Sequence, residues 1–282
     1  MQLPVGVCMV TAIAANISYV VESGYRKKNS TGGHRIMADT ALSPEILYED
    51  KDIIVVNKPA GMASQPDRSL RPDMVNWLKN SFAGQNADIY VVHRLDLPVS
   101  GVMVYARNRK AAAALSAQVN DASGRRSMEK DYLAVLTGIP HVADEKTAKK
   151  NRLHMEAWLS KEKGKNLSVV TDQKVSAADW CALDYEILTV TEGSEPSLSL
   201  VRIHLLTGRR HQIRAMMAHA GAGVWGDRKY NPLFTGQRGP SALALQAQRL
   251  SFLHPASGKK MEFCLPPSQT ILAIVPEAGR FC

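Results

Sequence analysis

One short segment of the chain sets a carboxylate among groups that could use it. His93, Arg94 and Asp96 lie between two apolar runs, at residues 89–92 and 102–106. An acid this close to a core must be paired, hydrogen-bonded or used in chemistry, because burial of an isolated charge is costly. A structural aspartate in a turn or a helix cap is the simpler explanation. Arg94 could pair with Asp96, although residues two apart share a face only where the strand stays regular.

A second polar cluster lies far downstream at residues 207–214, which read TGRRHQIR. Arg209 or Arg214 could reach Asp96 from across the fold and leave Arg94 free to contact a phosphate or a displaced base. A helix that begins inside the cluster would add free backbone N–H groups and its dipole to the arginine charge. The cluster could also be a solvated basic face. If it meets Asp96, the two clusters together indicate an enzyme that acts on RNA.

The histidines allow two other interpretations. His211 and His219 could ligate a metal ion, but they lack the i, i+4 spacing of helical zinc sites, and no acid occupies the general-base position between them. We therefore expect no metal. A phosphodiesterase that uses His93 and His211 is the second alternative, and it requires two accessible imidazoles that lie close together.

The composition favours a folded domain with a polyanionic partner. The 282 residues are 45% hydrophobic and 22% charged, enough to bury a substantial core. A formal net charge of +9 favours a polyanion, since counterions released from phosphates drive binding. The cysteines show neither zinc-site spacing nor the density of a disulfide framework, which predicts reduced thiols in the cytoplasm: Cys8, Cys181, Cys264 and Cys282.

We expect a flexible extension at residues 1–44 and one catalytic domain at residues 45–282. Residues 1–21 are fairly apolar but lack a basic N-terminal region, which argues against a signal peptide or a membrane helix. A polar, glycine-bearing stretch follows, and a folded-domain pattern begins only after Met37. No membrane association is predicted.

Hydrophobic patterns predict the elements that carry these clusters. Two strands joined by a charged turn are expected within residues 46–56, and β-branched runs predict further strands at residues 90–92, 102–106, 131–136, 180–190, 198–205, 250–252 and 260–265. Helices are expected at residues 73–81, 108–119 and 210–220. Residues 143–174 should form a hairpin with mobile loops, and residues 242–247 are ambiguous. This is an α+β pattern dominated by sheet.

Two turns are expected near the first cluster. The proline and glycine of residues 57–62 predict a turn that carries an exposed Lys58. Ser100 and Gly101 are expected to turn the chain into the strand at residues 102–106.

The motifs resemble those of the RluA-type family of RNA pseudouridine synthases. Five occur in the family's order and cover about residues 45–266: NKPAGM at 57–62, HRLD at 93–96 followed by Ser100 and Gly101, KDYLAV at 130–135, TGRRHQIR at 207–214 and RLSFLHP at 249–255. Residues before 45 leave little room for the small N-terminal RNA-binding domain of larger relatives, so target recognition is expected to rest on the catalytic domain.

The resemblance implies a mixed, mostly antiparallel sheet split by a catalytic cleft. It implies Asp96 as the catalytic aspartate, Arg214 as its partner and Tyr132 as the residue that stacks on uracil, although a strand aromatic is ordinarily a core residue. Substrate contacts are expected from Arg94, which displaces and holds the nucleotide, and from His93, Arg209, His211, Gln212 and Leu245. No cofactor or metal is implied, and the expected partner of this monomeric, cytoplasmic protein is structured tRNA or rRNA.

The expected chemistry moves uracil from its N1 bond to a C5 bond at C1′ of the ribose. Asp96 could attack C1′ as a nucleophile or remove the 2′ proton to give a glycal-like intermediate, and the sequence leaves both open. The uracil must first leave its stack, at a cost of a few kcal/mol. A non-catalytic RNA-binding or ribosome-assembly factor with the same fold is the competing interpretation.

The chain departs from the family pattern beside several motifs. Family members usually carry threonine in place of Val99, a polar or charged pair in place of Leu97 and Pro98, and histidine in place of Met216 and Gln246. The acid and its arginine remain. The departures are expected to affect hydrogen bonding around the site and the choice of RNA stem.

Overall fold

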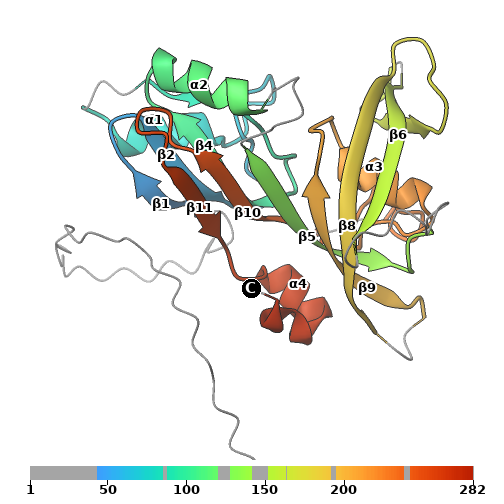
Figure 1. Cartoon of the computed structure of the whole chain (residues 1–282). Coiled ribbons are helices and arrows are strands. Elements are labelled where there is room, and N and C mark those ends of the chain that lie inside the picture. Colours follow the sequence, from blue (N-terminus) through green and yellow to red (C-terminus); the bar gives the residue numbers. More distant parts are fainter. Residues whose placement is uncertain are drawn as a thin grey trace, which may run out of the picture. The chain divides into compact units, whose positions relative to one another are not determined.

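The computed structural model describes residues 43–84, 88–119, 128–141, 152–162, 164–191, 195–237 and 242–281. All of them lie in one compact unit, residues 39–282. They form an α+β fold built on one large sheet (Figure 1). The predicted fold class is confirmed. Residues 1–42 of the predicted extension lie outside the described part, so the boundary at residue 45 stays a prediction.

The sheet is almost entirely antiparallel. Its described strands follow the order β1-β2-β4-β10-β5-β9-β8-β6-β7, with β3 paired to β4 and β11 paired to β10. The pair β4–β10 is parallel, and the other described pairs are antiparallel. The strands are β1 (Glu45–Glu49), β2 (Ile53–Lys58), β3 (Tyr90–Val91), β4 (Ser100–Ala106), β5 (Glu129–Thr137), β6 (Leu153–Lys161), β7 (Ser168–Thr171), β8 (Asp179–Thr191), β9 (Leu198–Leu205), β10 (Leu245–Leu253) and β11 (Lys260–Cys264).

Short helices cover this sheet. They are α1 (Met74–Ser81), α2 (Arg109–Val119), α3 (Gln212–His219) and α4 (Gln269–Ile274), followed by a 3-10 helix at Pro276–Arg280. Side-chain caps begin three of them, as expected from residue type: Asp73 accepts the N–H of Asn76, Asn108 that of Ala111 and Ser268 that of Ile271. Among the described helices, none has the length and apolar character required to cross a membrane.

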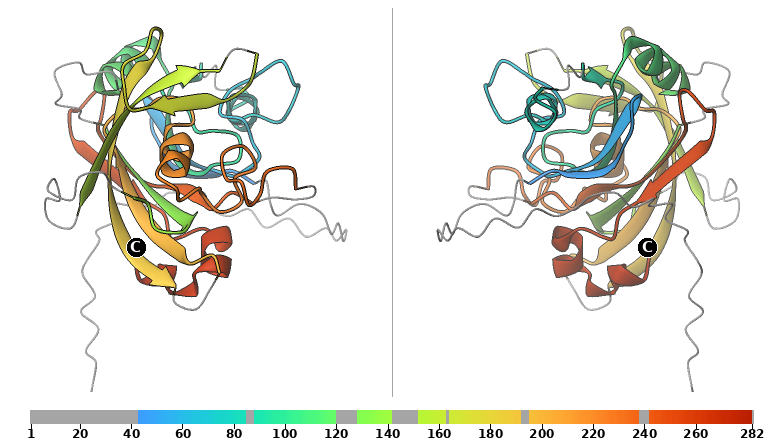
Figure 2. Two further views of the ribbon diagram at one scale, coloured as in Figure 1. Left: turned by 90° about the vertical axis from the view of Figure 1, so that its right-hand side faces the viewer. Right: turned by 90° about the vertical axis from the view of Figure 1, so that its left-hand side faces the viewer.

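The sheet is buried on both faces at β2 and β4. In β2, Ile54 and Val56 pack in one core cluster, while Ile53 and Val55 pack in another on the opposite face. Strands buried on both sides are expected to read as continuous apolar runs, as β2 does. The first cluster includes Ile213 and other residues of α3, and the second includes residues of α2. Figures 1 and 2 show these two helices on different parts of the sheet, with the long strands β8 and β9 curving past α3.

The predicted turn at Ser100 and Gly101 is wrong, because both residues belong to β4. The chain turns earlier, at Leu97 and Pro98. Gly101 is required for a different reason. It has a φ of +131°, and a Cβ at this position would collide with the backbone carbonyl of Ala247 in the parallel strand β10.

Most other predicted elements are confirmed, with altered bounds. The ambiguous residues 242–247 and the strand at 250–252 contribute to one strand, β10. Within the predicted hairpin, β6 and β7 do pair in antiparallel fashion, while residues 142–151 and 163 lie outside the described part. The helix predicted at 210–220 is shorter, because His211 adopts a left-handed backbone conformation with a φ of 54° and the helix begins after it. Its predicted packed residues, Ile213, Met217 and Ala220, are buried.

Candidate active site

Asp96 lies in the loop between β3 and β4. Its backbone carbonyl accepts the N–H of Val99 at 3.0 Å, which closes the turn, and its side chain is 25% exposed. Arg214 of α3 reaches this side chain, with Nη1 at 3.2 Å from Oδ2. The expected contact between Asp96 and Arg214 is therefore confirmed. A charge-assisted bond of this kind holds the carboxylate in one orientation.

Arg214 is itself held by a second carboxylate, which the sequence analysis missed. Its Nε and Nη2 donate to Oδ2 and Oδ1 of Asp227 at 2.7 and 2.8 Å, and both residues are buried. Burial alone lowers the pKa of Arg214, but hydrogen bonds and charges from Asp227 and Asp96 raise it overall. Asp227 follows the apolar residues 222–226 directly. An acid beside a core needs a cation, so the rule that singled out Asp96 could also have found Asp227.

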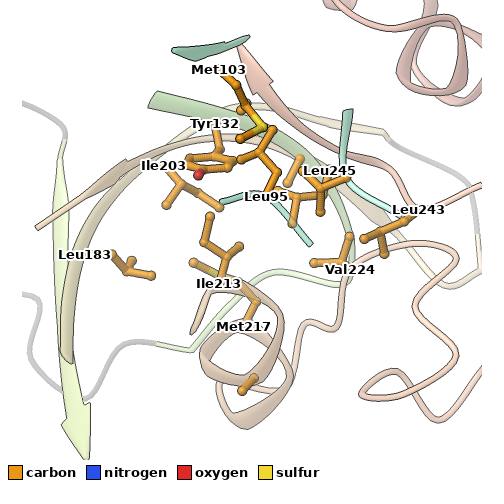
Figure 3. Packing of buried hydrophobic residues seen from close by; sticks show 14 of the residues in the cluster. Leu95, Met103, Tyr132, Leu183, Ile203, Ile213, Met217, Val224, Leu243 and Leu245 are labelled. Atoms are coloured by element: carbon orange, nitrogen blue, oxygen red, sulfur yellow. The ribbon is translucent and has the colours of Figure 1, made fainter. Parts of the chain in front are cut away.

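Tyr132 lies on the floor of the same region. It is in β5, between Ala247 of β10 and Ile203 of β9, and is 7% exposed. Figure 3 shows its ring beside Leu95, with Leu245 nearby and Ile213 of α3 facing them. Burial raises the pKa of Tyr132, and the charge of Asp96 raises it further. The phenol therefore stays protonated and offers an apolar ring close to the carboxylate.

His211 contacts Asp96 from the start of α3. Its Nε2 lies 3.7 Å from Oδ2 of Asp96, and its Nδ1 lies 2.7 Å from the hydroxyl of Tyr230. Burial lowers the pKa of His211 to about 4, with the charge of Asp96 opposing this and the charge of Arg214 adding to it. The imidazole is therefore neutral at physiological pH.

Two further predicted residues flank this centre. Arg94 is exposed, two residues before Asp96 in the same loop. Leu245 is buried at the start of β10. The centre thus offers a carboxylate held through one oxygen, a neutral imidazole, a protonated phenol, buried apolar side chains and an exposed arginine. This set suits chemistry on a flat base that enters from solvent.

His93 is not part of this centre by its contacts. It is buried, and its Nε2 accepts the backbone N–H of Val104 at 3.2 Å. Burial lowers its pKa well below the usual value, and the charge of Lys130 contributes. His93 is therefore neutral and tied to strand β4, which removes the basis for a phosphodiesterase with two catalytic histidines.

Gln212 and Arg209 are engaged within the protein. The side chain of Gln212 accepts from Thr207 Oγ1 at 2.7 Å and from the N–H of Arg209 at 3.0 Å, and it donates to Ala182 O at 3.0 Å. It therefore stabilises the turn that leads into α3. Arg209 is exposed, and its Nε donates to Trp180 O at 3.3 Å.

The predicted turn after β2 is present at Ala60 and Gly61, but Lys58 is buried, so its predicted exposure is wrong. It ends β2 with 0% exposure, and its Nζ donates to the carbonyls of Met62 at 2.7 Å, Pro59 at 2.9 Å and Leu97 at 3.5 Å. Burial lowers the pKa of Lys58 to about 7, against the charge of Asp96. Since Leu97 follows Asp96, Lys58 supports the loop that carries the carboxylate.

The residues that depart from the family pattern have partners of their own. Met216 is fully buried, with its sulfur 3.6 Å from that of Cys181. The amide of Gln246 donates to Pro266 O at 3.0 Å and accepts the N–H of Ser268 at 2.8 Å, which links β10 to the start of α4. Val99 is buried before β4.

Among the described residues, one cluster has side chains of the types that bind metal ions, but these side chains hydrogen-bond within the protein. Asp50, Asp52 and His254 lie together near the start of β2. His254 Nε2 lies 2.7 Å from Asp50 Oδ2, and Asp50 Oδ1 accepts the N–H groups of Asp52 and Ile53. These bonds stabilise the turn between β1 and β2 and give no reason to place a metal there.

Comparison with known proteins identifies the family. The family model described as RNA pseudouridylate synthase matches residues 52–219. Ribosomal large subunit pseudouridine synthase D of Zymomonas mobilis is 31% identical over 237 residues, which are 78% of this chain and 68% of that protein. tRNA pseudouridine synthase C of Pasteurella multocida is 30% identical over 246 residues, 83% of this chain and 96% of that protein.

Solved structures agree at the level of the fold. Human RNA pseudouridylate synthase domain containing 4 superposes with a TM-score of 0.61 at 20% identity and covers 84% of this chain and 93% of that chain. Human RNA pseudouridylate synthase domain containing 1 superposes with the same TM-score of 0.61 at 21% identity, and the match covers 84% of this chain and 90% of that chain. The chain belongs to the RluA-type family of RNA pseudouridine synthases, which are isomerases.

Proposed function

We propose that the protein converts uridine to pseudouridine in structured tRNA or rRNA, with Asp96 as the catalytic aspartate. The observation that carries the proposal is the half-buried Asp96 carboxylate, held at Oδ2 by a buried Arg214 above an apolar floor. Relatives are named for the ribosomal large subunit and for tRNA, so both RNA classes are candidates.

The reaction needs no group beyond the side chains at this centre. The bond from C1′ to N1 breaks, the uracil turns, a bond from C1′ to C5 forms, C5 loses its proton and N1 gains one. Asp96 either attacks C1′ and later leaves, or removes the 2′ proton and later returns one. Its Oδ2 faces Arg214 and His211. Oδ1 is therefore the oxygen proposed to react.

Access to the base is proposed to depend on Arg94 and Tyr132. Arg94 is exposed and precedes Asp96 by two residues, so it can enter the space left by an extruded nucleotide. Tyr132 and Leu245 offer the apolar surface on which the uracil rests. Arg209 is exposed, lies just before α3 in the sequence and is proposed to contact a phosphate of the RNA. Substrate contacts from His93 and Gln212 stay predictions.

Broader expectations concern the domain, the oligomeric state, the location and the binding of RNA. Residues 45–282 are proposed to be the catalytic domain. The monomeric state and the cytoplasmic location stay predictions. The net charge of +9 supports binding of an RNA, with an affinity that falls as salt rises.

The decisive experiment maps pseudouridine in total RNA treated with the wild type, with Asp96→Asn and with Asp88→Asn. Asp88 is an exposed carboxylate on the segment before β3 and serves as the matched control. We expect new pseudouridine with the wild type and with Asp88→Asn, and none with Asp96→Asn. Equal modification by Asp96→Asn would refute the assignment of the acid. RNA binding by the wild type without any modified uridine would favour the non-catalytic binding factor.

A further inference from the structure

Tyr230 stands where three elements of the candidate site meet. Its hydroxyl accepts the N–H of Ser168 in β7 at 2.8 Å and lies 2.7 Å from Nδ1 of His211. Its ring lies 5.2 Å from the guanidinium carbon of Arg214. Its own N–H donates to Oδ1 of Asp227 at 3.3 Å.

The hydrogen bonds of Tyr230 select one tautomer of His211. A neutral imidazole carries a single N–H, and a phenol carries a single O–H. The Tyr230 oxygen already accepts from Ser168, and Ser168 Oγ donates its own hydrogen to the carbonyl of Arg210 at 2.9 Å. Two groups can then accept the phenol hydrogen: Nδ1 of His211, which lies 2.7 Å from the hydroxyl, and the side chain of Ser168, which also bonds Tyr230. The short distance favours Nδ1, and with Nδ1 as the acceptor the imidazole hydrogen lies on Nε2.

Burial keeps His211 neutral, against the charge of Asp96. Burial is the largest influence on its pKa, which lies at about 4. Arg214, Lys229 and Arg210 lower that pKa further, while Asp96 raises it. The imidazole therefore acts through one N–H and not through a charge.

The Nε2 hydrogen faces the candidate catalytic acid. Nε2 lies 3.7 Å from Oδ2 of Asp96, the oxygen that also accepts from Arg214 Nη1 at 3.2 Å. Arg214 and His211 therefore both lie next to Oδ2 of Asp96. At 3.7 Å this N–H is beyond hydrogen-bond distance, so it stabilises negative charge on Oδ2 as a nearby dipole and leaves Oδ1 as the oxygen proposed to react.

We propose that Tyr230 is a positioning residue: it holds His211 with its hydrogen on Nε2, directed at Oδ2 of Asp96, and ties this arrangement to the β6–β7 hairpin through Ser168. The role in turnover rests on the proposed function, because it requires Asp96 to be the catalytic acid. The tautomer itself does not depend on turnover. The left-handed backbone of His211 supports the proposal, since such a conformation in a residue other than glycine is maintained by its surroundings.

The tautomer is measured by nitrogen NMR of protein labelled at its histidines, without RNA. His211→Gln identifies the resonance among the 8 histidines. We expect the hydrogen on Nε2 in the wild type and a larger fraction on Nδ1 in Tyr230→Phe, which keeps the ring but lacks the hydroxyl. A wild-type hydrogen on Nδ1, or the same ratio in both proteins, overturns the proposal.

Turnover is measured under single-turnover conditions on the RNA found by pseudouridine mapping. Tyr230→Phe is expected to lower the rate about tenfold, as for the loss of one hydrogen bond, and to change the RNA dissociation constant by less than about twofold. Tyr90→Phe is the matched control, because its hydroxyl bonds an exposed Asp88 from β3. It should keep the wild-type rate.

A double-mutant cycle separates positioning from general destabilisation. A glutamine amide in place of His211 has no tautomers for Tyr230 to select, so Tyr230→Phe should lower the rate further by less than about twofold in His211→Gln. An equal tenfold loss in both backgrounds overturns the proposal. If the wild type modifies no RNA, the proposed function fails, while the NMR result still decides the tautomer.

Discussion

Arg214 is shared by two carboxylates with different surroundings. Asp227 is fully buried and binds two nitrogens of the guanidinium, whereas the Asp96 side chain is one-quarter exposed and binds the third. The buried pair therefore sets where Arg214 lies, and Arg214 then sets where Asp96 points. Two parallel N–H bonds give a guanidinium a defined plane, which a single bond does not.

Replacing Asp227 by asparagine should be strongly destabilising. The change leaves a buried guanidinium with Asp96 as its remaining acid, and breaking a buried pair costs about 3–5 kcal/mol. The measurement is the free energy of unfolding from urea titration, together with the rate of pseudouridine formation.

The matched control is Glu186→Gln. Glu186 pairs with Arg202 at 3.4 Å, with both side chains 31% exposed, so its loss should cost less than about 1 kcal/mol. Equal losses in the two variants would show that Asp227 does not hold Arg214 as described.

Lys58 should make stability depend on pH above neutrality. Its pKa is about 7 in the folded protein because of burial, despite the charge of Asp96, and about 10.4 in an unfolded chain. Between these values the unfolded chain binds more protons, so stability rises with pH by up to about 1.4 kcal/mol per unit. The unfolding free energy of wild type minus that of Lys58→Met should therefore increase from pH 7.5 to pH 9.5.

Lys79→Met is the control for this experiment, since Lys79 is exposed on α1. Its difference from the wild type should stay constant over the same range. If the Lys58→Met difference is also constant, the carbonyls of Pro59, Met62 and Leu97 hold the ammonium charged in the folded protein.

At the scale of elements, the parallel contact between β4 and β10 positions the loop that carries Asp96. Gln246 and Ala247 of β10 pair with Ser100 and Gly101, which directly follow the loop of Asp96. The two strands approach closely at Gly101, where the β10 backbone leaves no room for a side chain. The position of Asp96 relative to Tyr132 therefore depends on a glycine five residues away.

Gly101→Ala should destabilise the protein and weaken its activity. The alanine combines a strained φ of +131° with a collision against the backbone of Ala247, and each effect costs about 1–3 kcal/mol. Gly84→Ala isolates the first effect, because Gly84 has a φ of +93° with nothing within 4 Å of the added carbon. The urea midpoint should fall clearly more in Gly101→Ala than in Gly84→Ala.

At the scale of the whole molecule, a row of alternating basic and acidic side chains crosses neighbouring strands of the sheet. Register places Arg249, Asp131, His204, Asp184 and His154 in neighbouring strands, from β10 through β5, β9 and β8 to β6. Arg249 and His204 bond the carboxylate of Asp131 at 2.7 and 2.6 Å, and His154 bonds Asp184 at 2.7 Å. The row includes β10, which pairs with β4 just after the Asp96 loop, and β9, which precedes α3.

Asp131 should contribute stability that acid removes. Burial raises its pKa, but hydrogen bonds and charges from His204 and Arg249 outweigh burial and lower it overall. A lowered folded pKa stabilises the protein above the unfolded value of about 3.9, and this stability is lost as pH falls toward the folded value. The free energy of unfolding of the wild type should therefore exceed that of Asp131→Asn at pH 7. The difference between the two free energies should become smaller between pH 5 and pH 3. A difference independent of pH would contradict this.

The sequence allowed most of the fold to be predicted, since strands and helices follow from local patterns. The continuous apolar run of β2, the cap at Asn108 and the packed face of α3 are all local. The errors at Gly101 and Lys58 share one cause. Whether a polar or glycine residue ends a strand or lies inside one depends on the neighbouring strand, which is distant in sequence.

The sequence by itself determined the family and the fold class, because motif residues and hydrophobic periods can be read without coordinates, and the family resemblance implied the pairing of Asp96 with Arg214. Only the tertiary structure decided that Asp227 holds Arg214, that Lys58 is buried beneath the loop and that Tyr230 contacts His211. These contacts join segments that lie at different distances along the chain. The register of the strands determines which of these segments come together. A local pattern cannot encode such distances, whereas the packed sheet determines them directly.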